Sequence, residues 1–268
     1  METRTLYIAA TIPATREEVF AVLTDSGRHS AMTGAESRID PREGGEFSYF
    51  GGGVRGVTKT LEENARIVQE LRADGWPDGH YATVTYELKP QADGQRTLAA
   101  VNEEGIPSEH FGQVVEGWQS YWEQFADFVR EEKVGIVRRF VEEYKNRQTP
   151  DAVDEFVAED CLIHLPLPGL PQGREGMRIN GQMMCTAFPD VHAEREFFVT
   201  EGDIVIERAN VTATHQAELI GIPATGRGVT WSELHAYRVT GGIISEIWSE
   251  ADFMGVMVQI GAVTMPAS

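Results

Sequence analysis

The first half of the chain alternates short runs typical of strands with two stretches typical of helices. Apolar residues alternate with polar ones from Leu6 to Ile12, which predicts a strand that ends before Pro13. Residues 15–18, Thr-Arg-Glu-Glu, have the form of a capping box and predict the start of a helix. Further on, five strands are predicted to form an antiparallel meander: GEFSYF, VRGVTKTL, ARIVQELR, HYATVTYEL and RTLAAVN.

Residues 117–131 are predicted to form a strongly amphipathic helix, because large apolar side chains recur there at helical spacing. These side chains are Trp118, Tyr121, Trp122, Phe125, Phe128 and Val129. The aromatic face must be covered, and the meander is the available cover. We therefore expect a curved antiparallel sheet that grips one long helix. The aromatic residues would serve first as core, and a cavity between sheet and helix would suit apolar ligands.

In the second half of the chain, the predicted helices come before most of the predicted strands. The helices are predicted at 136–144, 150–157 and 173–188, and a first strand at 161–167 leads into a loop enforced by Pro166, Pro168 and Pro171. Four long strands follow, joined as hairpins: VHAEREFFVTE, IVIERANVTATHQAE, GVTWSELHAYRV and IISEIWSE. Helices followed by a sheet that wraps them are typical of an α+β cone.

The chain has 268 residues, more than one core usually organises, so we predict two domains, residues 1–133 and 134–268. The charged string EEKVG marks the boundary, and the linker there would be short or helical. Hydrophobic residues at 41% and charged residues at 24% describe an ordinary globular chain.

The net charge of −19 repels phosphate backbones and anionic lipid surfaces, so neither nucleic acid nor a membrane is an expected partner. No apolar stretch reaches the ~18–20 residues of a membrane span, and the N-terminus lacks the layout of a signal peptide, which suggests a cytoplasmic location. Cys161 and Cys185 lie outside any C-x-x-C frame, so we expect two packed thiols, no disulfide and no metal site.

Several segments of the first half resemble START-like (SRPBCC) helix-grip domains of the heat-shock ATPase-activator type. They occur in the family's order over residues 5–131: TREEVFAVLTD, HSAMTG, GGEFSYFGGGVRGV, RIVQELR and GIPSEHFGQVVEGWQSYW. One departure is Met32, where many relatives carry Trp. The resemblance implies the fold but no single chemistry, since relatives include co-chaperone modules, binders of lipids or polyketides, and resistance proteins. An adaptor role toward a chaperone is one function that it leaves open.

Residues 134–263 resemble the SnoaL-like polyketide cyclases of the nuclear-transport-factor-like fold. The similarity rests on the FPD at 188–190 and on the segment from EGDIVIERAN at residue 201 to VMVQIGA at residue 262. It implies an α+β barrel and a cyclase that closes a ring by intramolecular aldol addition, without metal or cofactor. In that family an acidic side chain near the pocket floor acts as acid and base, and the matching position here is Asp252.

Asp252 has two interpretations. Apolar residues follow it, and an apolar setting would raise the pKa of a carboxyl group enough for it to accept a proton at neutral pH. An Asp at a junction of sheet and helix can equally cap the helix by accepting backbone N–H groups. Both interpretations remain open from the sequence.

Period-two alternation in the predicted strand 228–239 places Trp231, Glu233, His235 and Tyr237 on one face, expected to be a pocket wall. His235 is the second catalytic candidate, because an imidazole can donate a proton or a hydrogen bond to a developing alkoxide; the alternative is a hydrogen-bonded residue of the pocket wall. Trp231 and Tyr237 are predicted to contact the substrate. Five further residues are assigned to substrate binding, mainly from the resemblance: His164, Arg208, His215, Trp248 and Glu250.

Arg208 would pair with a substrate carboxylate or with Glu250. Relatives commonly carry His at the position of Ile247, so a mechanism that needs that imidazole would not transfer unless His235 replaces it. Together these features predict an α+β chain of two cone-like domains, with a cofactor-free cyclase for polyketide-like or other enolisable carbonyl compounds in the second. The alternative is a protein that binds a hydrophobic or aromatic small molecule without turnover. A homo-oligomer formed through the second domain is a further expectation.

Overall fold

The protein is described by a computed structural model that covers residues 1–165, 167 and 169–264. It divides into two compact units, residues 1–131 and residues 132–268. Two of the prolines expected to enforce a loop, Pro166 and Pro168, lie outside the described residues. Within the described part of the chain, no helix is both long and apolar enough to cross a membrane.

The first unit contains one seven-stranded antiparallel sheet. Its strands are β1 (Thr3–Ile12), β2 (Arg38–Ile39), β3 (Glu46–Tyr49), β4 (Val54–Glu62), β5 (Arg66–Ala73), β6 (Ala82–Pro90) and β7 (Thr97–Pro107). Their order in the sheet is β1-β7-β6-β5-β4-β3-β2, so β1 pairs with the last strand of the predicted meander. The short strand β2 was not predicted, because two residues carry no readable alternation.

Two short helices follow β1, and a long helix ends the unit. They are α1 (Arg16–Thr24), α2 (Ser26–Thr33) and α3 (Phe111–Val141). The predicted capping box is confirmed: Thr15 Oγ1 accepts from Glu18 N at 3.2 Å, and Glu18 Oε2 accepts from Thr15 N at 2.9 Å. Single 3-10 turns, η1 (Phe50–Gly52) and η2 (Ser108–His110), connect strands and helix.

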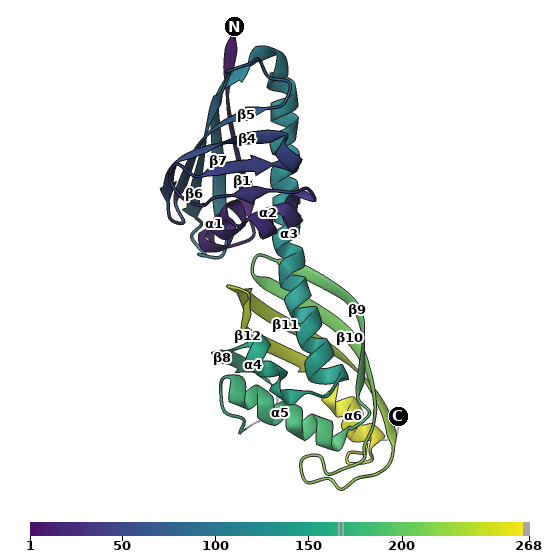
Figure 1. The fold of residues 1–268 in the computed structure, drawn as a ribbon. Helices are drawn as coiled ribbons and strands as arrows, with labels where there is room; N and C mark the ends of the chain where they lie inside the picture. The colour runs from purple at the N-terminus through teal and green to yellow at the C-terminus, as the bar shows by residue number, and fades with distance from the viewer. Residues whose placement is uncertain (166, 168, 265–268) are drawn as a thin grey trace. The chain divides into compact units, whose positions relative to one another are not determined.

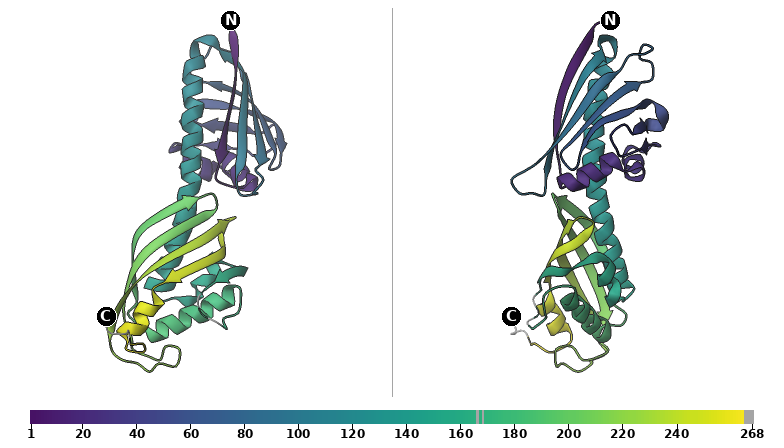
Figure 2. Two further views of the ribbon diagram at one scale, coloured as in Figure 1. Left: turned by 180° about the vertical axis from the view of Figure 1, so that it is seen from behind. Right: turned by 60° about the vertical axis from the view of Figure 1, so that its left-hand side comes forward.

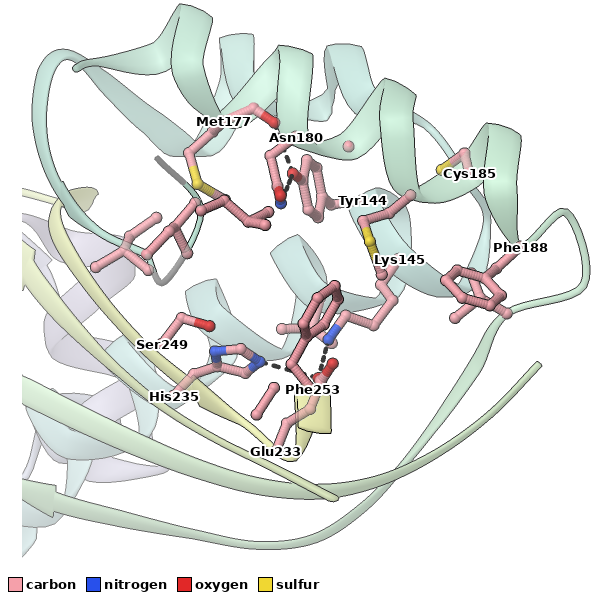
Figure 3. A pocket seen from close by; sticks show the side chains of 18 of the residues that line it. Tyr144, Lys145, Met177, Asn180, Cys185, Phe188, Glu233, His235, Ser249 and Phe253 are labelled. Atoms are coloured by element: carbon pink, nitrogen blue, oxygen red, sulfur yellow. Dashed lines mark hydrogen bonds and ion pairs between the residues drawn. The ribbon is translucent and has the colours of Figure 1, made fainter. Parts of the chain in front are cut away.

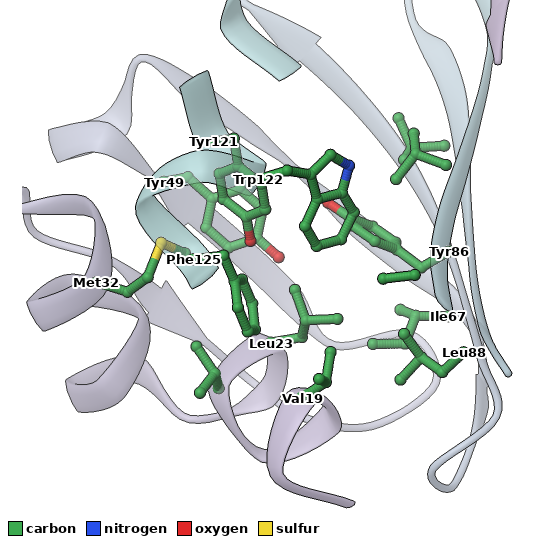
Figure 4. Packing of buried hydrophobic residues seen from close by; sticks show 14 of the residues in the cluster. Val19, Leu23, Met32, Tyr49, Ile67, Tyr86, Leu88, Tyr121, Trp122 and Phe125 are labelled. Atoms are coloured by element: carbon green, nitrogen blue, oxygen red, sulfur yellow. The ribbon is translucent and has the colours of Figure 1, made fainter. Parts of the chain in front are cut away.

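The sheet curves around the first part of α3, as Figures 1 and 2 show. Its concave face packs on the aromatic stripe of the helix, where Trp122 and Phe125 are almost fully buried. Figure 4 shows that α1 closes the lower end of this core with Val19 and Leu23. This arrangement confirms the predicted helix-grip fold.

The helix α3 is longer than the predicted 117–131. It continues through residues 132–136, where the sequence indicated a boundary and a new helical register. The segment contains no proline, and Gly135 costs a helix interior only about 1 kcal/mol relative to Ala. The helical form of the linker is therefore the one observed.

The second unit places its helices on one face of a five-stranded sheet. After α3 come a π-helical turn, η3 (Glu142–Asn146), a 3-10 turn, η4 (Pro150–Ala152), and α4 (Val153–Phe156), α5 (Arg174–Ala187) and α6 (Phe253–Gln259). The strands are β8 (Val157–His164), β9 (His192–Glu201), β10 (Ile204–Thr214), β11 (Gly228–Thr240) and β12 (Ile243–Ala251). Their order is β8-β12-β11-β10-β9, with only the β8–β12 pair parallel among the described strands. This is the predicted α+β cone, although β8 begins four residues earlier than expected.

Separate expression of residues 1–132 and 134–268 is expected to give two fragments that each unfold cooperatively. Each unit buries its own apolar clusters, which is what independent folding requires. Thermal unfolding followed by circular dichroism measures this, with the full chain as the reference. Absence of a cooperative transition in both fragments would refute the two-domain prediction.

Candidate active site in the second unit

A cavity of about 120 Å³ lies between the helices and the sheet of the second unit (Figure 3). Its walls are mostly apolar and come from the end of α3, from α5 and α6, and from β11 and β12. Gly181 permits the close approach of α5, because a Cβ atom there would lie 2.7 Å from the ring of Tyr144. The Tyr144 hydroxyl donates to Met177 O at 2.6 Å and holds this wall in place.

The strand β11 supplies most of the polar side of the cavity. Trp231, Glu233, His235 and Tyr237 all line it, on the face that period-two alternation predicts. Glu233 and His235 are only 6% and 9% exposed. A charged group buried to this degree needs partners, and Glu233 has three.

The Glu233 carboxylate is the centre of this group. Its Oε1 accepts from Trp231 Nε1 at 2.8 Å, and its Oε2 lies 2.9 Å from His235 Nε2. The same Oε2 forms an ion pair with Lys145 Nζ from η3. Figure 3 shows Lys145 and His235 converging on Glu233 from opposite sides of the cavity. We call Lys145, Glu233 and His235 the buried triad.

The charges of the buried triad determine which nitrogen of His235 carries the proton. Burial by itself would raise the pKa of Glu233, but the Lys145 ammonium and the hydrogen bond from His235 hold this pKa well below its usual range. An ionised carboxylate can only accept hydrogen bonds, so His235 Nε2 must donate. In a neutral ring, Nδ1 would then keep its lone pair, and Figure 3 shows this nitrogen on the side of Ser249, which also lines the cavity. Such an arrangement can act chemically as a general base oriented by a carboxylate.

A second buried carboxyl group, that of Glu207, lies beside His235 on the neighbouring strand. Glu207 is opposite His235 in the β10–β11 register, and its Oε2 accepts from the Tyr237 hydroxyl at 3.2 Å. Burial raises the pKa of Glu207. It is not among the described residues that line the cavity, but as the cross-strand neighbour of His235 it lies on the same face of the sheet.

The position of Asp252 favours the capping interpretation. The residue is the N-cap of α6, its Oδ1 accepts from Gly255 N at 2.8 Å, and its side chain is exposed. Its neighbours Ala251 and Phe253 line the cavity, but among the described residues Asp252 does not. The chain turns from strand to helix at this residue, and the turn directs the carboxylate to the helix end. The geometry thus supports the cap, and the acid/base role of Asp252 stays a prediction.

The structure also places Trp248, Glu250 and His164 away from the cavity. On β12 the side chains that line it are Ile247, Ser249 and Ala251, so the alternate residues Trp248 and Glu250 lie on the other face. His164 is on that face too, where its ring stacks on Trp248 and Nε2 lies 2.9 Å from Glu246 Oε1.

Arg208 and His215 make contacts within the protein. The Arg208 guanidinium donates to Ala209 O at 2.9 Å and lies 3.6 Å from Glu196, so its ion-pair partner is not Glu250. His215 is fully buried, with Nδ1 3.1 Å from Thr225 Oγ1. None of these five residues lines the cavity in the described part of the chain; on β12 the residues that do are the alternate Ile247, Ser249 and Ala251. Their assignment to substrate binding stays a prediction that this cavity does not support.

Sequence analysis missed Lys145 and assigned Glu233 no role. One signal for Lys145 was present: it lies four residues after Val141 and thus on the apolar stripe of its helix, an unusual place for an ammonium group. Its partner is 88 residues away along the chain and has no sequence signal. Among the described residues, no group of three or more His, Cys, Asp or Glu is arranged to hold a metal ion.

Comparison with known proteins identifies both units. Residues 13–130 match the family model "Activator of Hsp90 ATPase homolog 1-like protein", and residues 135–260 match "SnoaL-like polyketide cyclase". An activator of 90 kDa heat shock protein ATPase homolog from Dictyostelium discoideum is 31% identical over 118 residues, which are 44% of this chain and 30% of that protein. The match therefore spans under a third of that relative's length.

Two further matches each cover about half of this chain. The aklanonic acid methyl ester cyclase DauD of Streptomyces sp. (strain C5) is 29% identical over 132 residues, 48% of this chain and 81% of that protein. A crystal structure of an HSP90 activator from Plasmodium falciparum has 20% sequence identity and a TM-score of 0.44, covering 47% of this chain and 96% of the other.

Proposed function

Because residues 13–130 form a domain of the Hsp90 ATPase activator type and residues 135–260 a domain of the SnoaL-like polyketide cyclase type, we propose that the second unit closes a ring in a polyketide-like substrate. The second family is one of cyclases, and the cavity described above is the proposed active site. The substrate is an apolar, enolisable carbonyl compound, and the base is His235. The observation that carries this proposal is the hydrogen bond of His235 to an ionised, buried Glu233.

The first step is a proton transfer to His235. Nδ1 takes the proton from a carbon flanked by carbonyl groups, and the electron pair of the broken C–H bond delocalises as an enolate. The Glu233 carboxylate stabilises the imidazolium that forms, as a carboxylate does in hydrolytic triads. Lys145 keeps Glu233 ionised, although it does not touch the reacting atoms in this scheme.

The second step forms the ring. The enolate carbon attacks a ketone carbon of the same molecule, a C–C bond forms, and the ketone oxygen becomes an alkoxide. The imidazolium returns its proton to this oxygen, so substrate and product are isomers and no electrons are gained or lost. Ser249 is opposite His235 in the β11–β12 register and is positioned to donate a hydrogen bond to the developing oxyanion.

The test uses the full-length protein and aklanonic acid methyl ester, chosen because relatives named as cyclases of this ester match the second unit. A product of unchanged mass and new chromatographic retention, formed faster than in buffer alone, supports the proposal. A thermal shift without product favours the binding protein instead. If the ester gives no thermal shift and no product, aromatic polyketide esters are excluded as substrates. That result would count against the cyclase.

Asp252→Asn is expected to leave turnover within about threefold of the native value, and Asp252→Ala to lower the free energy of unfolding by about 1 kcal/mol. Asn caps a helix nearly as well as Asp, whereas Ala cannot accept from Gly255 N–H. Urea unfolding and initial rates measure the two effects. If Asp252→Asn unfolds normally but loses 100-fold or more of the rate, the catalytic role returns to Asp252.

A further inference from the structure

The first unit contains a cavity of its own, of about 170 Å³, between its sheet and α3. We infer that this cavity is a binding site for a small hydrophobic amine, held in its protonated form by the Glu103 carboxylate within aromatic walls. The site is separate from the buried triad, and the inference does not depend on the proposed cyclase activity.

Glu103 is the group that gives this cavity its chemical character. Alternation along β7 directs it inward, and only 3% of the residue is exposed. One carboxylate oxygen accepts from Trp118 Nε1 at 2.6 Å. No cation pairs with Glu103 in the described part of the chain, so the carboxyl group lacks the charged partner that buried carboxylates normally have.

Among the described residues that line the cavity, none is a lysine or arginine, and His29 is the one that could become a cation. Its Nδ1 lies 2.9 Å from Ser37 Oγ, and its Nε2 lies 3.1 Å from the Tyr121 hydroxyl. Burial lowers the pKa of His29 to about 4, so the imidazole is neutral near pH 7. Burial also disfavours the charged form of Glu103, whose pKa it raises. A ligand that brings its own cation would stabilise the ionised form of Glu103.

The aromatic walls of the cavity can contact both the ammonium group and the apolar part of such a ligand. Tyr49, Tyr86, Trp118 and Tyr121 line the cavity, and Figure 4 shows the three tyrosines turned toward one interior. The faces of such rings attract ammonium groups, more strongly where water is excluded. Acid and aromatic faces together therefore favour an ammonium ligand over a neutral or anionic one.

The volume limits the ligand to about one ring. An engineered protein cavity of about 150 Å³ binds benzene, and the present cavity is of similar size. Benzylamine and benzyl alcohol are therefore suitable probes, because they share the ring and the methylene and differ in the charge of the polar group. Tryptophan fluorescence of the full-length protein can follow their binding, since Trp76 and Trp118 line the cavity.

The native protein is expected to bind benzylamine at least about tenfold more tightly than benzyl alcohol at pH 7, as a charge-assisted hydrogen bond would predict. Glu103→Gln retains an acceptor for Trp118 but removes the charge. It should weaken benzylamine binding at least about tenfold and change benzyl alcohol binding less than about threefold. The matched control is Glu104→Gln, which alters an exposed carboxylate on the same strand and should change neither.

A second pair of variants tests the location without altering the charge. Gly117 borders the cavity on α3, and a Cβ atom there would meet no atom within 4 Å, so Gly117→Leu can introduce a side chain beside the site without a clash at Cβ. Gly112→Leu is the control on the same helix, where a Cβ atom also has free space. We expect Gly117→Leu to weaken both probes and Gly112→Leu to weaken neither. Equal binding of the two probes to the native protein, absence of binding, or benzylamine affinity unaffected by Glu103→Gln and Gly117→Leu would each overturn the inference.

Discussion

Replacement of His235 by glutamine is expected to lower the turnover of a cyclised substrate by about 10²- to 10⁴-fold, the usual contribution of a general base. Glutamine can still donate a hydrogen bond to Glu233, so the wall of the cavity should keep its shape. Glutamine cannot accept a proton near neutral pH, so the enolate would form only by slow transfer of the substrate proton to water. Binding of the substrate, measured by thermal shift, should change little.

The control for this variant is His164→Gln. His164 is a partly exposed histidine on the opposite face of the same sheet, and it makes one ion-pair contact, with Glu246. The His164→Gln variant should turn over substrate at the native rate. If His235→Gln also retains the native rate, His235 is a binding residue and the proposed mechanism is wrong.

Replacement of Lys145 by methionine is expected to lower the free energy of unfolding of the second unit by about 3–5 kcal/mol. Methionine fits the apolar surroundings, but it leaves the Glu233 carboxylate buried without its ammonium partner. The loss of stability comes mainly from that unpaired charge. Urea unfolding measures it. Arg147→Met, which removes two exposed ion pairs, with Glu142 and Glu143, should cost less than about 1 kcal/mol.

Two further measurements test the cause of that loss. Lys145→Met combined with Glu233→Gln removes both charges and should recover much of the stability. The effect should also depend on pH, because the folded-state pKa of Glu233 is depressed by Lys145. The native pair contributes its stability above the unfolded pKa of about 4.3, and this contribution is lost as pH falls further. The difference between native protein and Lys145→Met should therefore narrow below about pH 4; a difference that stays constant would assign the loss to packing.

Local patterns determined much of the fold. The capping box at Thr15 forms as expected, since its partners are three residues apart. The aromatic stripe of residues 117–131 determined which face of α3 the first sheet covers. Alternation along β11 placed Trp231, Glu233, His235 and Tyr237 on one wall, because successive side chains of a strand point to opposite faces.

The tertiary structure decided which of those faces became a site. Alternation separates the two faces of β12, but which face lines the cavity depends on the cover from α5 and α6, so Ser249 lies inside while Trp248 and Glu250 lie outside. Asp252 could be a catalyst or a cap by its neighbours in sequence, and the turn into α6 made it a cap.

The buried triad could not be predicted from the sequence either, because it depends on how separate elements pack. Glu233 and His235 are two residues apart, and their shared face could be predicted from the strand. Lys145 belongs to another element, and only the packing of η3 against the sheet brings its ammonium group to Glu233. Spacing along a helix or strand is set by backbone geometry and can be read from the sequence. A charge pair across 88 residues depends on how complete elements pack, and its effect on Glu233 depends on the water that this packing excludes.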